Sequence, residues 1–250
     1  MLKEEGANDM HNLCVAHRGF SSRAPENTMA AISLAMKQSY VQWVEVDVQL
    51  SKDGVPFLIH DYKLNRTTSG RGLVKDKTWA ELRTMDAGSW KSKEYKGERL
   101  ISLDEFLDTI CGRLRANIEI KTQGDMYPGI EEKVISAVKR RQMQNDVVLT
   151  CFDPLILARV KEISRDIQTG LIIEGNPSDL LLRLQLLRCS FLSINYRYLT
   201  ADLVTQVTNY GITIMAWTLD NIGAIKSIAA MHKGILICTN KPDIWYQAMF

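Results

Sequence analysis

The sequence predicts an α/β fold, a (β/α)8 TIM barrel with a small insertion between the second strand and its helix. Short β-rich runs alternate with amphipathic helical segments along almost the whole chain. Two of these runs are too close in sequence for a helix to lie between them, which leaves eight strands in regular alternation with helices. The length of 250 residues is also the usual size of such a barrel.

Nine runs have the length and composition of strands. They cover residues 13–17, 43–50, 55–60, 116–121, 147–152, 170–173, 191–195, 212–218 and 235–239. Helical segments of ten or more residues are predicted between most of them, for instance over 26–38, 130–142, 155–164, 201–210 and 221–231. A doubly wound open sheet is the alternative. The barrel is favoured because no glycine-rich phosphate loop follows the first strand.

The second and third runs are predicted to form a hairpin. Only the residues SKDG separate them, which is too short for a helical crossover, and Asp53-Gly54 is a hairpin signal. A two-residue turn at this position pairs Asp47 with His60, so that both side chains project from the same face of the hairpin. A shift of one residue in this register would turn His60 away from Asp47.

Residues from about 61 to 99 break the alternation, because they are rich in Gly, Ser, Lys and Arg and show little periodicity. With the hairpin turn they form an insertion at about 51–99, which is followed by a predicted helix over 102–110. A loop of this length in a compact domain is either disordered or functional. No internal repeat or linker indicates a second domain, so we expect residues 1–250 to form a single barrel domain.

The composition excludes several classes of protein. With 46% hydrophobic and 24% charged residues the chain has ample material for a core, which excludes a disordered protein. The net charge of +2 provides no broad basic field for a nucleic acid. The N-terminal residues MLKEEGANDMHN contain neither a secretory signal nor a membrane anchor, and no apolar run approaches the length of a membrane span. Five scattered cysteines without CxxC spacing predict a reducing, cytoplasmic location.

The first strand ends in a histidine and an arginine, His17 and Arg18. The carboxyl ends of the strands form the active face of a barrel, so we expect both side chains at the catalytic site. Taken alone, the two residues are explained equally well by a histidine bonded to a carbonyl group and an arginine that caps a helix.

The second strand carries two carboxylates, Glu45 and Asp47, on one face. Two like charges on a buried strand repel each other and are costly to desolvate unless a cation joins them. A divalent metal ion is the simplest such cation. A structural salt bridge to Arg18 or Lys121 is the alternative.

The next barrel strand repeats the alternation, because Asn117, Glu119 and Lys121 share one face. If this face points into the barrel, Glu119 becomes a third carboxylate of the same site. Three carboxylates suit Mg²⁺ or Ca²⁺ better than Zn²⁺, since zinc favours Cys and His ligands. Lys121 provides a point charge for a phosphate group.

Two apolar features remain open to two interpretations. Trp217 ends a strand and forms either an apolar wall of the pocket or part of the core. The leucine-rich run DLLLRLQLLR over residues 179–188 predicts a barrel helix buried on one side. A dimer interface or a lipid-facing patch is the alternative for this run, so a homodimer is a possible assembly.

Several short motifs occur in a fixed order over residues 13–121. They are His17-Arg18-Gly19, Pro25-Glu26-Asn27-Thr28, Glu45-Val46-Asp47-Val48, Lys52-Asp53-Gly54, His60-Asp61, Arg66-Thr67-Thr68-Ser69-Gly70 and Glu119-Ile120-Lys121. Residues 216–218 and 237–243 continue the series more loosely. Together these motifs resemble the glycerophosphodiester phosphodiesterase family, because no other common barrel carries this series.

The resemblance implies the hydrolysis of small-molecule glycerophosphodiesters to glycerol 3-phosphate and an alcohol, a reaction of glycerol and lipid metabolism. It also implies a role for each candidate residue: Glu45, Asp47 and Glu119 hold a divalent metal, His17 and His60 act as acid and base, Arg18 contacts the phosphate, and Lys121 and Trp217 line the substrate site. Which histidine is the acid, and whether water or the glycerol 2-hydroxyl is the nucleophile, stays open. The alternatives are a lysophospholipase D that acts on lysolipids and a non-catalytic relative that binds phosphodiesters.

The chain departs from the family pattern at two places. Thr239-Asn240 stands where relatives usually have Thr-Asp, and Ile101-Ser102 stands where they usually have a proline. Neither departure removes a predicted catalytic group. Asn240 does remove a negative charge near the active face, which we expect to affect the alcohol preference or the order of the loop.

Overall fold

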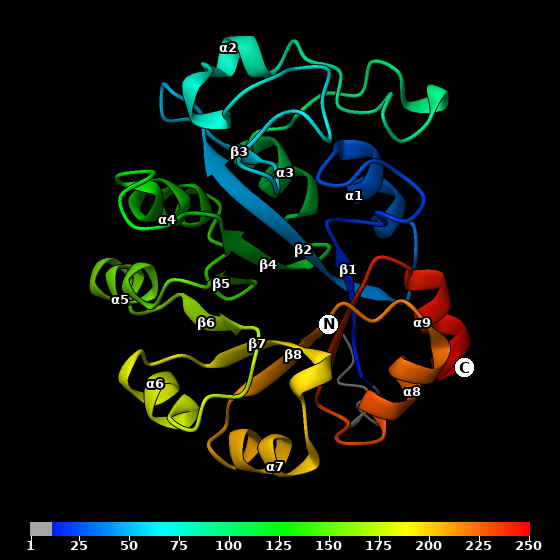
Figure 1. Cartoon of the computed structure of the whole chain (residues 1–250), viewed down its shortest axis with the longest axis vertical. Helices are drawn as coiled ribbons and strands as arrows, with labels where there is room; N and C mark the ends of the chain where they lie inside the picture. Colours follow the sequence, from blue (N-terminus) through cyan, green and yellow to red (C-terminus); the bar gives the residue numbers. More distant parts are fainter. Residues whose placement is uncertain (1–11) are drawn as a thin grey trace, which may run out of the picture.

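The computed structural model describes residues 12–250 and confirms the TIM barrel (Figure 1). Eight parallel strands close into a ring in the order β1-β9-β8-β7-β6-β5-β4-β2, and β1 pairs with β2. The ninth strand, β3, is antiparallel to β2. Residues 1–11, for which the sequence predicts neither a secretory signal nor a membrane anchor, lie outside the described residues. Within residues 12–250, no helix is long and apolar enough to cross a membrane.

The secondary-structure elements follow the predicted order. The strands are β1 (Cys14–His17), β2 (Val41–Leu50), β3 (Pro56–Leu58), β4 (Arg115–Ile120), β5 (Val147–Cys151), β6 (Gln168–Ile173), β7 (Phe191–Asn195), β8 (Thr213–Trp217) and β9 (Leu236–Thr239). The α-helices are α1 (Met29–Met36), α2 (Trp79–Leu82), α3 (Leu103–Ile110), α4 (Ile130–Arg140), α5 (Pro154–Ile163), α6 (Leu180–Leu186), α7 (Ala201–Asn209), α8 (Ile222–Ala229) and α9 (Pro242–Met249). Three short 3₁₀ helices are η1 (Val74–Asp76), η2 (Lys93–Tyr95) and η3 (Tyr196–Tyr198).

The alternation of side chains along the strands divides the buried residues into two groups. Val46 on β2 and Ile118 on β4 are fully buried in the main core, which lies between the strands and the surrounding helices. The opposite face of the same strands points into the barrel and carries Glu45, Asp47 and Glu119. Asp47 lies directly opposite Glu119 in the parallel register of β2 and β4. Predicted alternation and observed register therefore agree for these two strands.

The register of the hairpin differs from the predicted one by one residue. The Ile59 N–H donates to the Asp47 carbonyl oxygen at 3.0 Å, so Asp47 lies opposite Ile59 and not opposite His60. The predicted pairing of Asp47 with His60 was therefore wrong. His60 nevertheless reaches the active face, because the side chain of Gln49 holds the backbone beyond β3 there.

The shift arises in the turn, which has three residues and not two. The Ser51 N–H donates to the Val55 carbonyl oxygen at 3.0 Å, and the Ser51 hydroxyl accepts the Val55 N–H at 2.9 Å. Gly54 has φ +79°, which a glycine adopts without the steric cost of a side chain. Ser51 closes the turn with its side chain as well as its backbone, and the loop is one residue longer than predicted. Each residue of β2 is therefore paired one position earlier along β3 than predicted.

The insertion (residues 59–101) is more ordered than its composition predicts. It contains η1, α2 and η2, and in Figure 1 it lies at the top of the view beside α1 and α3. With β3 it has a small core of its own, formed by Phe57, Ile59, Leu64, Val74, Leu82, Ala87 and Leu100. Its two ends meet, because the Leu58 N–H donates to the Ile101 carbonyl oxygen at 3.0 Å.

The loop between β1 and α1 is longer than predicted, since α1 begins at Met29 with Thr28 as its N-cap. Gly19 lies in this loop with φ +78°, and a Cβ atom there would lie 2.7 Å from the carbonyl carbon of Ala31. Only glycine fits this approach. The loop therefore holds the chain after His17 close against α1.

The leucine-rich helix α6 is buried on one side, as the sequence predicts. Leu180 and Leu184 are buried, whereas Leu182 and Leu186 are 56% and 73% exposed. A homodimer that covers this exposed face stays a prediction.

Candidate active site

The predicted site residues meet at the carboxyl ends of the strands. One cavity, which we call the inner cavity, has a volume of about 140 Å³ and is lined by His17, Arg18, Glu45, His60, Asn117, Glu119, Lys121, Phe152, Ile172, Ser193, Met215, Trp217, Thr218 and Cys238. This set contains seven of the eight residues singled out from the sequence. The eighth, Asp47, is buried next to them and is 1% exposed.

The three predicted metal ligands form one cluster. Glu45, Asp47 and Glu119 each offer a carboxylate oxygen, and these atoms lie within 4.8 Å of one another. Asp47 Oδ1 is buried and accepts no hydrogen bond from the residues that the structure describes. An all-oxygen donor set with an unsatisfied buried oxygen fits a hard divalent cation such as Mg²⁺ or Ca²⁺.

Two basic side chains contact the same carboxylates. Arg18 Nε lies 3.1 Å from Asp47 Oδ2, and Lys121 Nζ lies 2.8 Å from Glu119 Oε1 and 3.7 Å from Asp47 Oδ1. The salt bridges weighed as an alternative to a metal are therefore present as well. They neutralise only part of the acidic charge, since the cluster has three carboxylates.

The protonation of the cluster reflects this partial neutralisation. Burial opposes ionisation of Asp47, but the charges of Arg18 and Lys121 outweigh it and hold the pKa of Asp47 well below its usual range. Burial, with the Asp47 charge beside it, raises the pKa of Glu45 well above its usual range. The same two causes raise the pKa of Glu119 to about 7. Without a further cation the cluster therefore retains protons near neutral pH.

His17 is held by an asparagine from the other end of the chain. His17 Nδ1 lies 2.7 Å from Asn240 Oδ1, and Asn240 Nδ2 donates to Asp220 Oδ2 at 2.7 Å. Because a carboxylate only accepts hydrogen bonds, the amide nitrogen of Asn240 must face Asp220 and its oxygen must face His17. The proton of His17 is thus on Nδ1. Its Nε2 carries the free lone pair, 3.7 Å from Glu45 Oε2.

The charge state of His17 agrees with this tautomer. Burial, with the positive charge of Arg18 beside it, lowers the pKa of His17 to about 4. The imidazole is therefore neutral at pH 7, with a lone pair available on Nε2.

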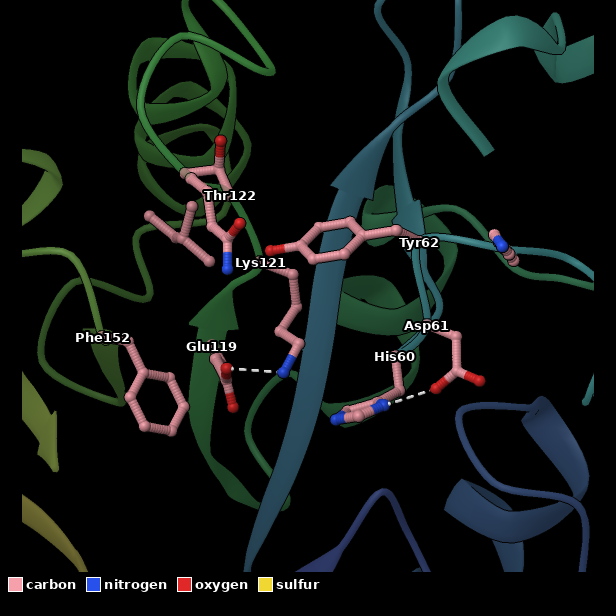
Figure 2. A pocket seen from close by; sticks show the side chains of 10 residues that line it. His60, Asp61, Tyr62, Glu119, Lys121, Thr122 and Phe152 are labelled. Carbon is pink, nitrogen blue, oxygen red and sulfur yellow. Dashed lines mark hydrogen bonds and ion pairs between the residues drawn. The ribbon is translucent and has the colours of Figure 1, made fainter. Parts of the chain in front are cut away.

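His60 is held by a carboxylate, Asp61. His60 Nδ1 lies 2.7 Å from Asp61 Oδ1, and Figure 2 shows the other ring nitrogen on the side of Glu119 and Lys121. Arg66 donates to both oxygens of Asp61, at 2.8 and 2.9 Å. Side-chain hydrogen bonds from Arg66 hold the pKa of Asp61 well below its usual range. Asp61 is therefore an ionised acceptor for the Nδ1 proton of His60.

The same arginine links the two halves of the site. Arg66 also donates to both oxygens of Glu26 at 2.8 Å, and Glu26 accepts a hydrogen bond from Arg18 at 2.8 Å. A continuous series of ion pairs thus runs from Asp61 in the insertion to Arg18 at the end of β1.

A buried glutamine replaces the predicted strand pairing in placing His60. Gln49 Nε2 lies within hydrogen-bond distance of the carbonyl oxygens of Ile59, His60 and Asp61, at 3.1, 2.9 and 3.0 Å. Its Oε1 accepts the Tyr127 hydroxyl at 2.8 Å, which fixes the orientation of the amide. The chain therefore curves around the Gln49 side chain as it leaves β3, and His60 is brought to the rim of the barrel.

A second, more open cavity adjoins the inner one. This outer cavity has a volume of about 670 Å³ and is lined by His60, Asp61, Tyr62, Lys63, Glu119, Ile120, Lys121, Thr122, Gln123 and Phe152 (Figure 2). His60, Glu119, Lys121 and Phe152 line both cavities, whereas His17 lines only the inner one. Only the first four residues of the insertion after Ile59 contribute to the outer cavity.

The sequence places Asn240 near the active face, but it does not predict the positioning roles of the four residues that hold the others in place. Asn27 donates to Asp47 Oδ2 at 2.9 Å, and Gln49, Asp220 and Asn240 have the contacts given above. Gln49 continues the inward face of Glu45 and Asp47 at a spacing of two, so the alternation of β2 contained its signal. Asp220 and Asn240 follow the ends of β8 and β9, which places them on the active face by the same rule as His17.

Known proteins match this chain in sequence and in structure. Residues 17–244 match the model of the Glycerophosphoryl diester phosphodiesterase family. A glycerophosphodiester phosphodiesterase of Caldanaerobacter subterraneus subsp. tengcongensis is 36% identical over 84% of this chain and 87% of its own length. A second enzyme of that name, from Bacillus subtilis, is 30% identical over 94% of this chain and 85% of its own length.

Among solved structures, a phosphodiesterase of Oleispira antarctica in complex with the product sn-glycerol-3-phosphate superposes with a TM-score of 0.85. It is 31% identical, and the match covers 95% of this chain and 96% of that one. A glycerophosphodiester phosphodiesterase of Agrobacterium tumefaciens has a TM-score of 0.81 at 27% identity, over 94% of this chain and 99% of that one.

Proposed function

Since the chain belongs to the glycerophosphoryl diester phosphodiesterase family and is thus a phosphoric diester hydrolase, we propose that it converts glycerophosphodiesters to glycerol 3-phosphate and an alcohol by metal-dependent acid-base catalysis. The observation that carries this proposal is the meeting of three carboxylates and two oriented imidazoles around one cavity. A protein that only bound phosphodiesters would have no use for two histidines that are each fixed at Nδ1.

The acidic cluster is the proposed metal site. Mg²⁺ or Ca²⁺ held by Glu45, Asp47 and Glu119 would neutralise the phosphodiester and stabilise the charge that grows on its oxygens. Arg18 and Lys121 line the inner cavity, so we assign them to the phosphate oxygens. Trp217 forms an apolar wall of the same cavity.

The two histidines divide the proton transfers between them. His17 Nε2 has the free lone pair and lies in the inner cavity, so it removes the proton of the nucleophile, which is water or the glycerol 2-hydroxyl. A new P–O bond forms to this oxygen while the P–O bond to the alcohol breaks. If the nucleophile is the 2-hydroxyl, the product of this step is a cyclic phosphate, which water then opens to glycerol 3-phosphate. His60 lines both cavities and stands where the alcohol leaves, so its Nε2 protonates the departing alkoxide.

Glycerophosphodiesters suit the two cavities better than lysolipids do. A lysolipid carries its acyl chain on the glycerol half, and such a chain would have to extend out of the inner cavity of about 140 Å³. The glycerol phosphate half fits the inner cavity, and the alcohol half extends outward. We propose a cytoplasmic location, which is supported by five cysteines that are all free thiols.

The metal requirement is tested by Glu45→Gln. The variant loses a ligand charge, so we expect turnover of a glycerophosphodiester with saturating Mg²⁺ or Ca²⁺ to fall by about 10³-fold or more. Thermal unfolding in EDTA should be unchanged or shifted to higher temperature, because glutamine removes a buried carboxyl group that must be protonated on folding or held against the charge of Asp47. Glu132→Gln, at an exposed glutamate of α4, is the matched control and should behave as the parent protein. Full activity of Glu45→Gln in EDTA would contradict the proposal.

Metal binding should also depend on pH. Glu119, with its pKa raised to about 7, is protonated below that pH, and a bound proton competes with the ion. We therefore expect the affinity for Mg²⁺ or Ca²⁺ to rise from about pH 6 to about pH 8, with release of protons on binding. Titration calorimetry in two buffers of different ionisation enthalpy measures both quantities. An affinity that is independent of pH over this range would contradict a raised pKa of Glu119 at the metal site.

A further inference from the structure

The walls of the outer cavity are mostly apolar. The ring of Tyr62 comes from the insertion, and the ring of Phe152 follows β5 on the opposite side of Lys121 in the view of Figure 2. Phe152 is 47% exposed, although it is a large hydrophobic residue at the active face. An exposed aromatic ring beside a catalytic cavity offers contact area to a ligand.

The carboxylates of this cavity are already paired with cations. Asp61 is bound by Arg66 through two hydrogen bonds and by His60 through a third. Glu119 accepts a hydrogen bond from Lys121 at 2.8 Å. A cationic group that entered the outer cavity would therefore find acidic side chains whose charge is already neutralised by partners of the protein itself.

The positive groups of the cavity add a second obstacle for a cation. Lys121 Nζ lies 6.0 Å from the centroid of the Phe152 ring, within the range of a cation–π contact. The ring face that would attract a quaternary ammonium thus already faces an ammonium group. Lys63 also lines the cavity, and it forms no salt bridge with the residues that the structure describes.

We propose that the outer cavity is the subsite for the alcohol half of the substrate, and that it selects neutral alcohols with an apolar body over alcohols with a cationic group. This inference rests on the proposed function, since it places the glycerol phosphate in the inner cavity. Tyr62 and Phe152 supply the contact area, Lys121 already occupies a face of the Phe152 ring, and Lys63 repels a positive charge. The insertion thereby contributes to alcohol selection through its first residues and not through its distal part.

The test compares two substrates of the same shape that differ in one charge. Glycerophosphocholine carries a quaternary ammonium, and the 3,3-dimethylbutyl ester of glycerol phosphate replaces its nitrogen with carbon. With metal present, we expect kcat/KM for the neutral ester to exceed that for the choline ester about tenfold, because Lys63 repels a positive charge in the cavity. A ratio of one or less, with both esters hydrolysed, overturns the inference and leaves the proposed function intact. Failure to hydrolyse either ester overturns the proposed function.

Charge substitution separates the role of the cavity from general electrostatics. In Lys63→Glu, the ratio of kcat/KM for the neutral ester to kcat/KM for the choline ester should fall to about one or below one. The main cause should be a lower KM for the choline ester. Lys75→Glu makes the same charge change in η1, outside the residues that line either cavity, and should leave the ratio as it is in the parent protein. Equal ratios in the two variants would contradict the assignment of Lys63 to the alcohol subsite.

The contribution of the Phe152 ring is tested in the same assay. Phe152→Leu retains an apolar side chain and should retain the preference for the neutral ester. Phe152→Asp provides an unpaired acid and should shift the preference toward choline. A loss of choline turnover in Phe152→Leu, with the neutral ester unaffected, would show that the ring binds a cation, and would refute the proposal.

Discussion

His17 and His60 face one cavity but are presented by regions that differ in construction. His17 ends β1, which is hydrogen-bonded to β2 on one side and to β9 on the other. His60 lies beyond the end of β3, in an insertion with its own small core, where the buried side chain of Gln49 bonds the backbone. A closed barrel can therefore present one side chain to the cavity from its strands and a second from a segment that is fixed mainly by side chains.

The two imidazoles also differ in the charge of their partners. Each has a side-chain oxygen 2.7 Å from Nδ1, but that oxygen belongs to a neutral amide at His17 and to a carboxylate at His60. A carboxylate stabilises an imidazolium more than an amide does. Burial lowers the pKa of both rings, but only His60 has a carboxylate partner that opposes this effect, which supports its proposed role as the acid.

The largest expected effect comes from removing either ring. His17→Ala and His60→Ala should each lower kcat by about 10²- to 10⁴-fold with little change in KM, since each group acts on a proton in the transition state. The double variant should lose much less than the product of the two single losses. Steady-state kinetics with a natural glycerophosphodiester measures all three.

An activated ester separates the two roles in these variants. A nitrophenyl ester needs no general acid, so it should restore turnover in His60→Ala and leave His17→Ala inactive. The opposite pattern would exchange the assignments of acid and base. Full activity of His60→Ala on the natural ester would remove His60 from the mechanism.

A smaller effect is expected from the partners of the two rings. Asn240→Ala and Asp61→Ala each leave an Nδ1 proton without its acceptor, and we expect kcat to fall about 10- to 100-fold with KM nearly unchanged. The nitrophenyl ester should compensate for Asp61→Ala but not for Asn240→Ala, because only Asp61 supports the proposed acid. Asp220→Asn tests the tautomer assignment, since it allows the Asn240 amide to rotate and should cost kcat as well. Unchanged kcat in both Asn240→Ala and Asp220→Asn would contradict the positioning role of this pair.

The smallest expected effect concerns the stability of the insertion. The backbone N–H groups of Ser89 and Gly97, with others nearby, lower the pKa of Asp86 to about 2. Asp86→Asn should lower the free energy of unfolding by about 1 kcal/mol, or the melting temperature by about 2–4 °C. Because the pKa of Asp86 is lower in the folded than in the unfolded protein, its carboxylate stabilises the fold at pH values above the unfolded-state pKa. This stabilisation is lost as the pH falls, so the difference in unfolding free energy between Asp86→Asn and the parent protein should shrink below about pH 4.

Differential scanning calorimetry from pH 7 to acid provides this measurement. Asp76→Asn changes a carboxylate in η1 of the same insertion and is the control for net charge. A difference for Asp86→Asn that stays constant down to pH 3, or one that Asp76→Asn reproduces, would show that the hydrogen bonds of Asp86 do not stabilise the insertion.

The alternation of polar and apolar residues predicted the strands of the barrel and its acidic centre, which is formed by Glu45, Asp47 and Glu119. This pattern can be recognised within each single strand. Glu45 and Asp47 alternate with buried valines, and Glu119 follows the same rule on β4. The hairpin register could not be predicted in this way, since it depends on the hydroxyl of Ser51. In physical terms, a period of two fixes the face of a strand but not the length of the turn that connects it to its partner.

Contacts between distant residues were equally hidden. His17 and Asn240 are separated by 223 residues, and no periodicity connects them. The sequence of the insertion does contain a helix signal, although its composition is that of a loop. Thr78 and Glu81 form a capping box at the start of α2. Structure in a polar segment is thus predicted better from its helix caps than from its overall composition.

The hydrogen bond between Leu58 and Ile101 has a consequence for how such a barrel can change. The insertion leaves and rejoins the barrel at one point, so the ring of strands closes without it. A segment with adjoining ends can be exchanged between related proteins as a cassette, provided that the graft preserves His60 and the contact with Gln49. Libraries of grafted insertions would then vary the proposed alcohol subsite while the acidic centre on β2 and β4 remains in place.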